Sequence, residues 1–101
     1  MKIYFVYILL CSDDSYYVGF TNNLQRRLLE HSNKRNPYSY TSKRLPVRVV
    51  YFERYDSPII GIYREKQIKG WSRIKKEALI EKRYDDLPKL SRKKNRTKDR
   101  F

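Results

Sequence analysis

The sequence predicts one α+β domain, in which a three-stranded antiparallel β-sheet is flanked by α-helices in the order β-β-α-β-α-α. Aromatic and β-branched runs at residues 4–10, 16–20 and 47–53 are typical of short strands. Helix start signals follow the second and third of these runs. A chain of 101 residues fits one domain. Because three short strands cannot bury a core by themselves, helices are expected to cover them.

The first two strands are joined by a short polar turn. Residues 12–15 read Ser-Asp-Asp-Ser, and such side chains bond their own backbone in turns. Residues 4–10 and 16–20 therefore predict a hairpin. Thr21 or Asn22 is expected to cap the helix that comes next.

The helix after the hairpin carries one apolar stripe with two functional side chains beside it. At about 100° per residue, Leu24 and Leu28 form the inward stripe. Arg27 and His31 are four residues apart and border that stripe, whereas Arg26 points away from it. Arg27 and His31 are therefore expected where the helix meets the sheet. Tyrosines that emerge from the two strands are expected to converge on the same place.

Four short motifs occur in order along the chain: Phe5-Val6-Tyr7, Tyr17-Val18-Gly19, Arg27-x-x-x-His31 and Glu65 on a predicted helix. Together they resemble the GIY-YIG nuclease domain, in its small stand-alone bacterial (YhbQ-like) form. The resemblance covers residues 3–84.

Two positions depart from the family pattern. Phe5 stands where the family has its first glycine, which has no chemical role. Many members also carry an Asn after the last helix that supports the metal or phosphate site. Residues 83–86 read Arg-Tyr-Asp-Asp and contain no Asn, which implies an altered supporting shell or low activity.

The resemblance implies a divalent-metal-dependent endonuclease that hydrolyses phosphodiester bonds in DNA. Branched, flapped or damaged DNA would be its substrate, in repair or recombination. One carboxylate is a weak hold on a metal, so water and substrate would complete the shell, which suits Mg²⁺ or Mn²⁺. The implied catalytic residues are Tyr7, Tyr17, Arg27, His31 and Lys69, with Gly19 as a structural position and Glu65 as the metal ligand.

Each implied residue has a chemical role. Arg27 would neutralise charge that develops on the phosphoryl oxygens, and His31 would orient the nucleophile or relay a proton. Tyr7 or Tyr17 would act as base or position the water. A phenol with a pKa near ~10 is a poor base at neutral pH, so it needs a nearby cation such as Lys69 or Arg27. The order of the two tyrosines' roles stays open.

A second helix is predicted from residues 56–58 (Asp-Ser-Pro) to Lys69, with Gly70 as its stop. Glu65 and Lys69 are four residues apart on one side, and Gly61 lies on that side one turn earlier. Spacing alone indicates a surface ion pair for Glu65 and Lys69. Gly61 has two explanations, since a side chain there would block what Glu65 faces, or the glycine allows close packing against a neighbour.

A third helix is predicted from Ser72 to residue 82 or 83. Trp71, Ile74 and Ala78 form its expected inner stripe, and its outer face is basic. Residues 1–84 then make the domain, and residues 85–101 a basic tail that is expected to be disordered.

The charge indicates the partner. The chain has 24 Lys and Arg against 11 Asp and Glu, a net charge of +13. Such an excess favours a polyanion, with nucleic acid, and DNA first, as the leading candidate. The expected nucleic-acid contacts, from loops, helix surfaces and tail, are Arg26, Lys34, Arg35, Tyr40, Thr41, Lys43, Arg44, Arg73, Lys76, Arg92, Lys93 and Lys94.

The composition also limits the alternatives. The single cysteine, Cys11, excludes an internal disulfide, so a reducing cytoplasmic setting is expected. No run approaches the ~20 apolar residues that span a membrane, and no small-molecule cofactor is expected. Two other functions fit the same sequence. One is a catalytically silent nucleic-acid-binding module on this fold, and the other is a basic protein associated with ribosomes or RNA.

Overall fold

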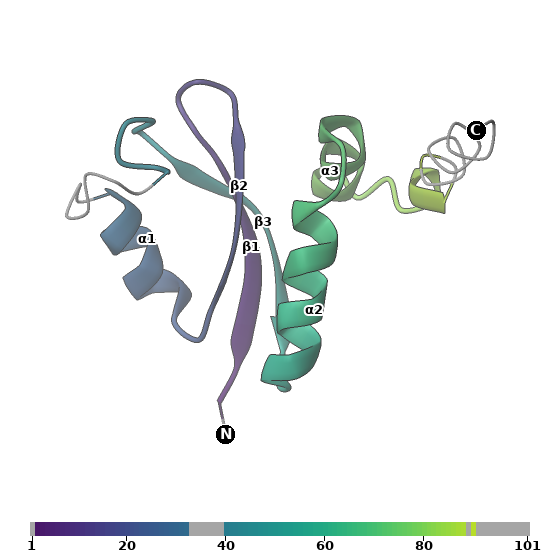
Figure 1. Cartoon of the computed structure of the whole chain (residues 1–101), viewed down its shortest axis with the longest axis horizontal. Helices are drawn as coiled ribbons and strands as arrows, with labels where there is room; N and C mark the ends of the chain where they lie inside the picture. The colour runs from purple at the N-terminus through teal and green to yellow at the C-terminus, as the bar shows by residue number, and fades with distance from the viewer. Residues whose placement is uncertain (1, 33–39, 89, 91–101) are drawn as a thin grey trace. The chain divides into compact units, whose positions relative to one another are not determined.

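The computed structural model describes residues 2–32, 40–88 and 90, and its contacts divide the chain into two compact units, Met1–Gly70 and Trp71–Phe101. The predicted order of elements, β-β-α-β-α-α, is confirmed (Figure 1). Residues 91–101 of the predicted tail lie outside the described residues. The elements are β1 (Tyr4–Leu10), β2 (Tyr16–Thr21), α1 (Leu24–Ser32), β3 (Arg48–Tyr55), α2 (Pro58–Lys69) and α3 (Arg73–Ile80).

The strands form the predicted three-stranded antiparallel sheet, in the order β2-β1-β3. Tyr7 on the central strand pairs with Gly19 of β2 on one side and with Phe52 of β3 on the other. The register of β1 and β3 shifts between Ile8 and Leu9. β1 supplies more buried core residues than any other element, whereas β2 and β3 form the edges of the sheet.

The turn between β1 and β2 has the predicted chemistry. The Oδ1 atom of Asp13 accepts from the backbone N–H of Ser15 at 3.0 Å, and Cys11 N–H donates to the Ser15 carbonyl at 2.9 Å. Asp14 adopts a left-handed conformation with φ of 67°, which Asp tolerates better than most residues.

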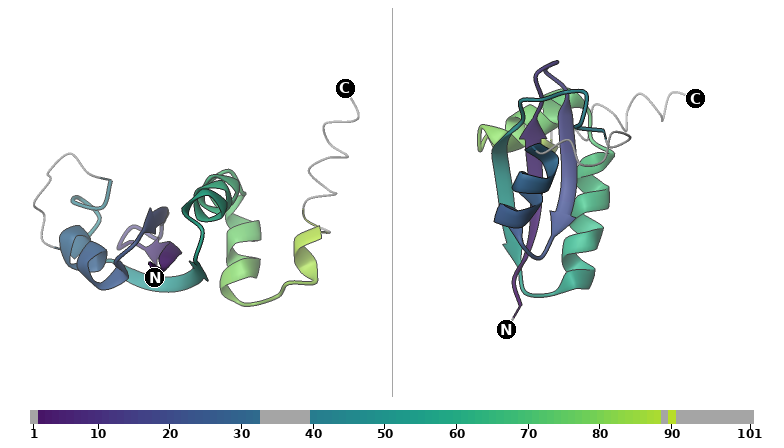
Figure 2. Two further views of the ribbon diagram at one scale, coloured as in Figure 1. Left: turned by 90° about the horizontal axis from the view of Figure 1, so that it is seen from below. Right: turned by 90° about the vertical axis from the view of Figure 1, so that its left-hand side faces the viewer.

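Helices α1 and α2 of the first unit lie on opposite sides of the sheet (Figures 1 and 2). On the α2 side, Gly61 packs against the ring of Phe20 in β2. A Cβ at Gly61 would lie 2.6 Å from a carbon of that ring. The Phe20 ring in turn stacks on Tyr4 with a centroid separation of 5.6 Å. Close packing is therefore the structural reason for Gly61, and the alternative explanation, an open space in front of Glu65, is not needed.

The cap of α1 differs from the prediction. Asn23, rather than Thr21 or Asn22, caps the helix, because its Oδ1 atom accepts from the backbone N–H of Arg26 at 3.0 Å. Thr21 still belongs to β2, and its hydroxyl accepts from the backbone N–H of Asn23 at 3.1 Å. The Thr21 hydroxyl therefore forms the turn that leads into the helix.

Helix α2 has the predicted ends, with Ser57 as its N-cap and Gly70 as its C-cap. A bidentate ion pair fixes it to β3, because Arg64 donates from Nε and Nη2 to the two Glu53 carboxylate oxygens at 2.9 Å each. Burial raises the pKa of Glu53, but hydrogen bonds from Arg64, Tyr51 and Tyr55 outweigh it and hold this pKa below its ordinary value. This network holds α2 at one rotation about its own axis. It therefore also sets the direction of the side chains next to Arg64 on the helix.

Helix α3 of the second unit is shorter than predicted. Its N-cap is Ser72, whose hydroxyl accepts from Lys75 N–H at 3.2 Å. The helix ends at Ile80 because Lys82 takes a left-handed conformation with φ of 59°. The expected inner position of Ile74 is wrong, since 61% of its surface is exposed, and the buried residues of the helix are Ala78 and Leu79. Among the described residues, no helix has the length and apolarity required to span a bilayer.

Candidate active site

The centre of the site is the phenol of Tyr7, which points from β1 across β2 on the side of α1. A Cβ on Gly19 would lie 2.3 Å from both Cζ and Oη of Tyr7. No L-residue other than glycine leaves room for the ring at this distance. Gly19 therefore allows the buried tyrosine of the central strand to extend across the edge strand.

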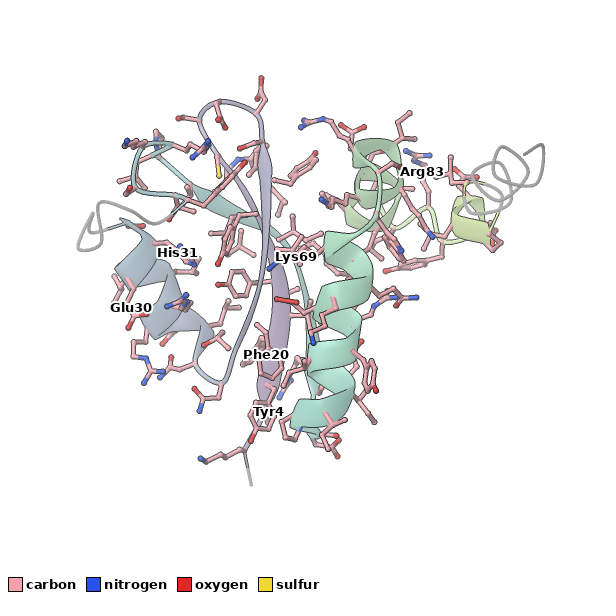
Figure 3. The ribbon with its side chains drawn as sticks, in the orientation of Figure 1. Tyr4, Phe20, Glu30, His31, Lys69 and Arg83 are labelled. Carbon is pink, nitrogen blue, oxygen red and sulfur yellow. The ribbon has the colours of Figure 1, made fainter. Side chains whose placement is uncertain are left out.

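A buried hydrogen-bonded chain starts at this phenol. The Tyr7 hydroxyl lies 3.0 Å from Nε2 of His31, and Nδ1 of His31 lies 2.8 Å from the Thr41 hydroxyl. Tyr7 and Thr41 have no exposed surface, and His31 is the buried residue of α1. Figure 3 shows His31 directed from α1 toward the sheet. Strand, helix and loop therefore meet at one imidazole.

Arg27 links the buried hydrogen-bonded cluster to the surface of the protein. Its side chain is 42% exposed and pairs with Glu30 through a 3.0 Å contact between Nη1 and Oε1. Hydrogen bonding with Tyr7 raises the pKa of Arg27 above its ordinary value, and interactions with Glu30 and Tyr17 act in the same direction. Arg27 therefore remains charged beside both phenols.

The protonation states of the buried members follow from their surroundings. Burial raises the pKa of Tyr7 to about 12, although the hydrogen bond from Arg27 acts against this rise. Burial lowers the pKa of His31, and the charge of Arg27 lowers it further, whereas Glu30 raises it. Near neutral pH, Tyr7 and His31 are therefore both uncharged, and Arg27 is the cation of the cluster.

Tyr17 lies between the buried cluster and the surface. Its ring centroid is 5.0 Å from that of His31, 6.3 Å from that of Tyr7 and 5.8 Å from that of Tyr40. The residue is half-buried, so its ring packs on the cluster while part of it meets solvent. The predicted juxtaposition of Tyr7, Tyr17, Arg27 and His31 is present.

Glu65 and Lys69 belong to α2, on the other side of the sheet. Nζ of Lys69 lies 3.4 Å from Oε2 of Glu65, which is the ion pair that the spacing indicates. The Glu65 side chain is only 17% exposed, so the pair is not an ordinary surface pair. Figure 3 shows Lys69 directed from α2 toward the sheet.

Glu65 of α2 and the phenol of Tyr7 lie at the same level along β2. Helix α2 and strand β2 run in opposite directions (Figure 1), and Gly61 packs against Phe20. Four residues advance a helix by about 6 Å, which is close to the length of two strand residues. Counted from Gly61 and Phe20, Glu65 comes level with Val18. Because Val18 lies between Tyr17 and Gly19, Glu65 is at the level of the Tyr7 phenol along β2, on the opposite face of the sheet.

The donor set fits a weakly held hard cation. Within residues 2–32, 40–88 and 90, no three His, Cys, Asp or Glu side chains gather as a metal-binding group. Both ring nitrogens of His31 have hydrogen-bond partners inside the protein, so this imidazole is not a ligand in the described state. Glu65 is left as a single, half-buried carboxylate, an oxygen donor that suits Mg²⁺ together with water and substrate oxygens.

The predicted nucleic-acid contact of Thr41 does not fit its position. Its side chain is buried, and its hydroxyl serves His31. Arg44 is also committed inside the protein, because its guanidinium pairs with Asp13 at 3.0 Å and lies 3.9 Å from the ring centroid of Tyr40. The sequence indicated a basic loop, but it does not show that the charge of Arg44 is already paired.

The other predicted contacts are distributed over both units. Arg26 is exposed on α1 and Lys43 is exposed in the loop before β3, whereas Tyr40 is 40% exposed. Arg73 and Lys76 belong to α3, where Arg73 pairs with Glu77 at 3.3 Å. Five of the predicted contacts lie outside the described residues: Lys34, Arg35, Arg92, Lys93 and Lys94.

Two functional neighbours were missed by sequence reasoning. Glu30 lies three residues after Arg27, a spacing that signals an ion pair on a helix. The partnership of Thr41 with His31 joins residues ten positions apart across a loop, and no local pattern signals it.

The chain is similar to a known protein family and to several curated proteins. A family model described as the GIY-YIG catalytic domain matches residues 3–78. A UPF0213 protein of Natronomonas pharaonis is 43% identical over 76% of this chain and 89% of its own length. A UPF0213 protein of Staphylococcus saprophyticus is 38% identical over 79% of this chain and 96% of its own length. The name UPF0213 states no activity.

Solved structures show the same fold. The solution NMR structure of a UPF0213 protein from Bacillus halodurans is 36% identical and superposes with a TM-score of 0.52, covering 78% of this chain and 83% of that protein. The solution NMR structure of a protein from E. faecalis is 32% identical, with a TM-score of 0.59, over 83% of this chain and 88% of that one.

Proposed function

The chain belongs to the GIY-YIG nuclease family, and we propose that it is a divalent-metal-dependent endonuclease that cleaves phosphodiester bonds in DNA. The observation that carries the proposal is the position of the charged Arg27 beside two phenols. Counted along α2 from Gly61, Glu65 comes to the same part of β2 on the other face of the sheet. The scissile phosphate would lie along the edge of β2, between these two groups. Branched, flapped or damaged DNA is the proposed substrate.

Arg27 is the proposed contact of the phosphoryl oxygens. Its guanidinium is charged and 42% exposed, so it can meet a phosphate while it still bonds the phenols behind it. Donors that are already oriented toward developing negative charge stabilise a transition state strongly. Arg27 would therefore act on the rate of cleavage more than on the affinity for DNA.

The proposed roles of Tyr7 and Tyr17 differ because the two side chains differ in burial. Tyr17 is half-buried and borders solvent, so its hydroxyl is the one that can contact the water nucleophile. As a phenolate hydrogen-bonded to Arg27, Tyr17 would accept the proton that the water loses and become a neutral phenol. Tyr7 has no exposed surface and stays protonated, so it would hold Arg27 and His31 in place.

Glu65 is the proposed metal ligand. Its single carboxylate would hold Mg²⁺ or Mn²⁺ together with water and substrate oxygens. When bound, such an ion supplies Lewis-acid activation of a phosphate oxygen. Lys69, paired with Glu65 at 3.4 Å, would orient the carboxylate before a metal arrives. We also propose a cytoplasmic location, in keeping with the free thiol of Cys11.

The test is a cleavage panel. Labelled duplex, single-stranded, flapped and four-way DNA would be incubated with the protein and Mg²⁺, Mn²⁺ or EDTA. We expect cleavage with either metal and none with EDTA. Tyr17→Phe should lose cleavage, whereas Tyr63→Phe, which changes a tyrosine with 73% of its surface exposed on α2, should not. Binding of DNA in EDTA without cleavage of any substrate would instead support a catalytically silent binding module.

A further inference from the structure

We infer that Thr41 is a positioning residue, whose hydroxyl holds His31 in the tautomer that carries its proton on Nδ1. In this form the Nε2 atom of His31 accepts the hydrogen bond of the Tyr7 hydroxyl. Nothing in the family motifs assigns a role to this threonine. The effect of Thr41 on cleavage rests on the proposed nuclease function, but the tautomer itself does not.

The tautomer follows from counting donors around Tyr7. Among the described residues, no buried side-chain nitrogen or oxygen lacks a hydrogen-bond partner. Tyr7 is completely buried, so its single hydroxyl proton needs an acceptor inside the protein. A guanidinium has donors only, so Arg27 cannot accept that proton. Nε2 of His31, 3.0 Å away, is the acceptor.

The role of Thr41 as a hydrogen-bond acceptor follows from this result. A neutral imidazole carries one proton, so an Nε2 atom that accepts leaves the proton on Nδ1. That proton is donated to the Thr41 hydroxyl oxygen at 2.8 Å. The hydrogen bond to one ring nitrogen thus fixes the function of the other, as it does for many functional histidines.

Three interactions hold Thr41 in this place. Nε of Arg44 pairs with Oδ2 of Asp13 in the β1–β2 turn at 3.0 Å. The Arg44 carbonyl accepts from Ser12 N–H at 2.9 Å, and Arg44 N–H donates to the Thr41 carbonyl at 3.0 Å. The segment 40–44 is therefore fastened to the hairpin turn beside the site. Arg44 therefore anchors the segment that contains Thr41, and its guanidinium is paired with Asp13.

The tautomer matters because it sets the direction of the Tyr7 proton. With Nε2 as acceptor, this proton points to His31, and the lone pairs of the Tyr7 oxygen remain available to Arg27. With the proton on Nε2 instead, the Tyr7 hydroxyl would lose its acceptor and turn its own donor toward a guanidinium. Two donors would then face each other, and Arg27 would leave its place beside the phenols.

The chain has a single histidine, so nitrogen-15 NMR of the imidazole reports on His31 alone. We expect the wild-type protein, without DNA or metal, to show the Nδ1–H form near neutral pH. Thr41→Ser keeps the hydroxyl and should keep this form. Thr41→Val keeps the shape, removes the acceptor and should abolish the single Nδ1–H form. Thr21→Val is the control, since it removes a buried hydroxyl that bonds the Asn23 backbone instead of His31.

Cleavage is the second readout. Loss of the outer partner of a histidine costs about 10- to 100-fold at metal sites, and we expect Thr41→Val to lower the cleavage rate within this range. Thr41→Ser should restore the wild-type rate.

An imidazole that carries its proton on Nε2 in the wild-type protein would overturn the inference, whether or not any variant folds. A Thr41→Val spectrum identical to that of wild type would overturn it equally. A protein with the Nδ1–H form that cuts no substrate would contradict the nuclease proposal and leave the assignment of Thr41 intact.

Discussion

The hydroxyl of Tyr7 and the α-carbon of Gly19 occupy adjacent positions in neighbouring strands, so close that a Cβ on Gly19 would lie 2.3 Å from the Tyr7 oxygen. The tyrosine of the first motif and the glycine of the second are therefore one structural unit. The glycine has no chemical part in the site, but it makes room for the phenol that holds Arg27 and His31.

Substitution of Gly19 tests this unit. Gly19→Ala should force the Tyr7 ring aside and destabilise the protein by about 1–3 kcal/mol, as overpacking of a core does. In a domain of this size that loss lowers Tm by at least about 4 °C. Gly70→Ala is the matched control, because the nearest atom to its added Cβ, outside the adjoining residues, is 3.6 Å away. Equal melting temperatures for the two variants would contradict the account.

Alkaline pH should weaken the fold through Tyr7. The pKa of Tyr7 is raised from its ordinary 10.0 to about 12 in the folded protein. Above pH 10 the unfolded chain therefore loses this proton while the folded protein keeps it, so stability is present below pH 10 and is lost as the pH rises toward 12. Tyr55 is shifted in the same direction and adds to the loss.

The free energy of unfolding, measured with denaturant at pH 9 and pH 11, shows how much of the alkaline loss of stability is due to Tyr7. Between these values we expect Tyr7→Phe to lose about 1 kcal/mol less stability than wild type. Tyr63→Phe, at an exposed position on α2, should lose as much as wild type. If wild type and Tyr7→Phe lose the same amount, the phenol is not protected as its burial implies.

Arg27 and Arg26 form a natural pair of tests. Both contact Glu30, at 3.0 Å and 3.8 Å, so either substitution removes an ion pair to the same carboxylate. Only Arg27 reaches the phenols, so Arg27→Ala should lower the single-turnover cleavage rate on the order of 10²–10³-fold. Arg26→Ala should only weaken binding of DNA, as the loss of one phosphate contact does. Similar rates for the two variants would exclude a selective role for Arg27.

The sequence predicted the fold because its signals are local. Aromatic and β-branched runs, a turn of short polar residues and well-placed caps determine β1, β2 and α2 with little help from the rest of the chain. The errors have local causes as well. The left-handed conformation of Lys82 ends α3 early, and the Thr21 hydroxyl forms a turn, so that the cap of α1 falls on Asn23.

The site was predictable only in part. The helical spacing of Arg27 and His31 and the strand positions of Tyr7 and Tyr17 indicated their convergence. The partner of His31 comes from a loop, and loops bring residues together without a period that a sequence reveals. For the same reason the sequence does not reveal the ion pair between Arg44 and Asp13, and Arg44 was predicted to contact nucleic acid.

Glu65→Gln tests whether Glu65 holds the metal at the edge of β2, as we propose. The substitution keeps shape and volume but removes the charge. Stability should change little, because Gln keeps the volume of the side chain and Lys69, its partner in the ion pair, is 57% exposed. Glu81→Gln, on a 59% exposed side chain, alters the net charge equally and is the control.

The measurement is the nicking rate of a flapped DNA substrate as a function of Mg²⁺ concentration, for wild type, Glu65→Gln and Glu81→Gln. We expect wild type and Glu81→Gln to saturate with Mg²⁺ at similar rates. Glu65→Gln should cut on the order of 10²–10³-fold more slowly at every concentration, while it binds DNA at least as tightly. Equal rates and equal Mg²⁺ dependence for wild type and Glu65→Gln would contradict the assignment of Glu65 as the metal ligand.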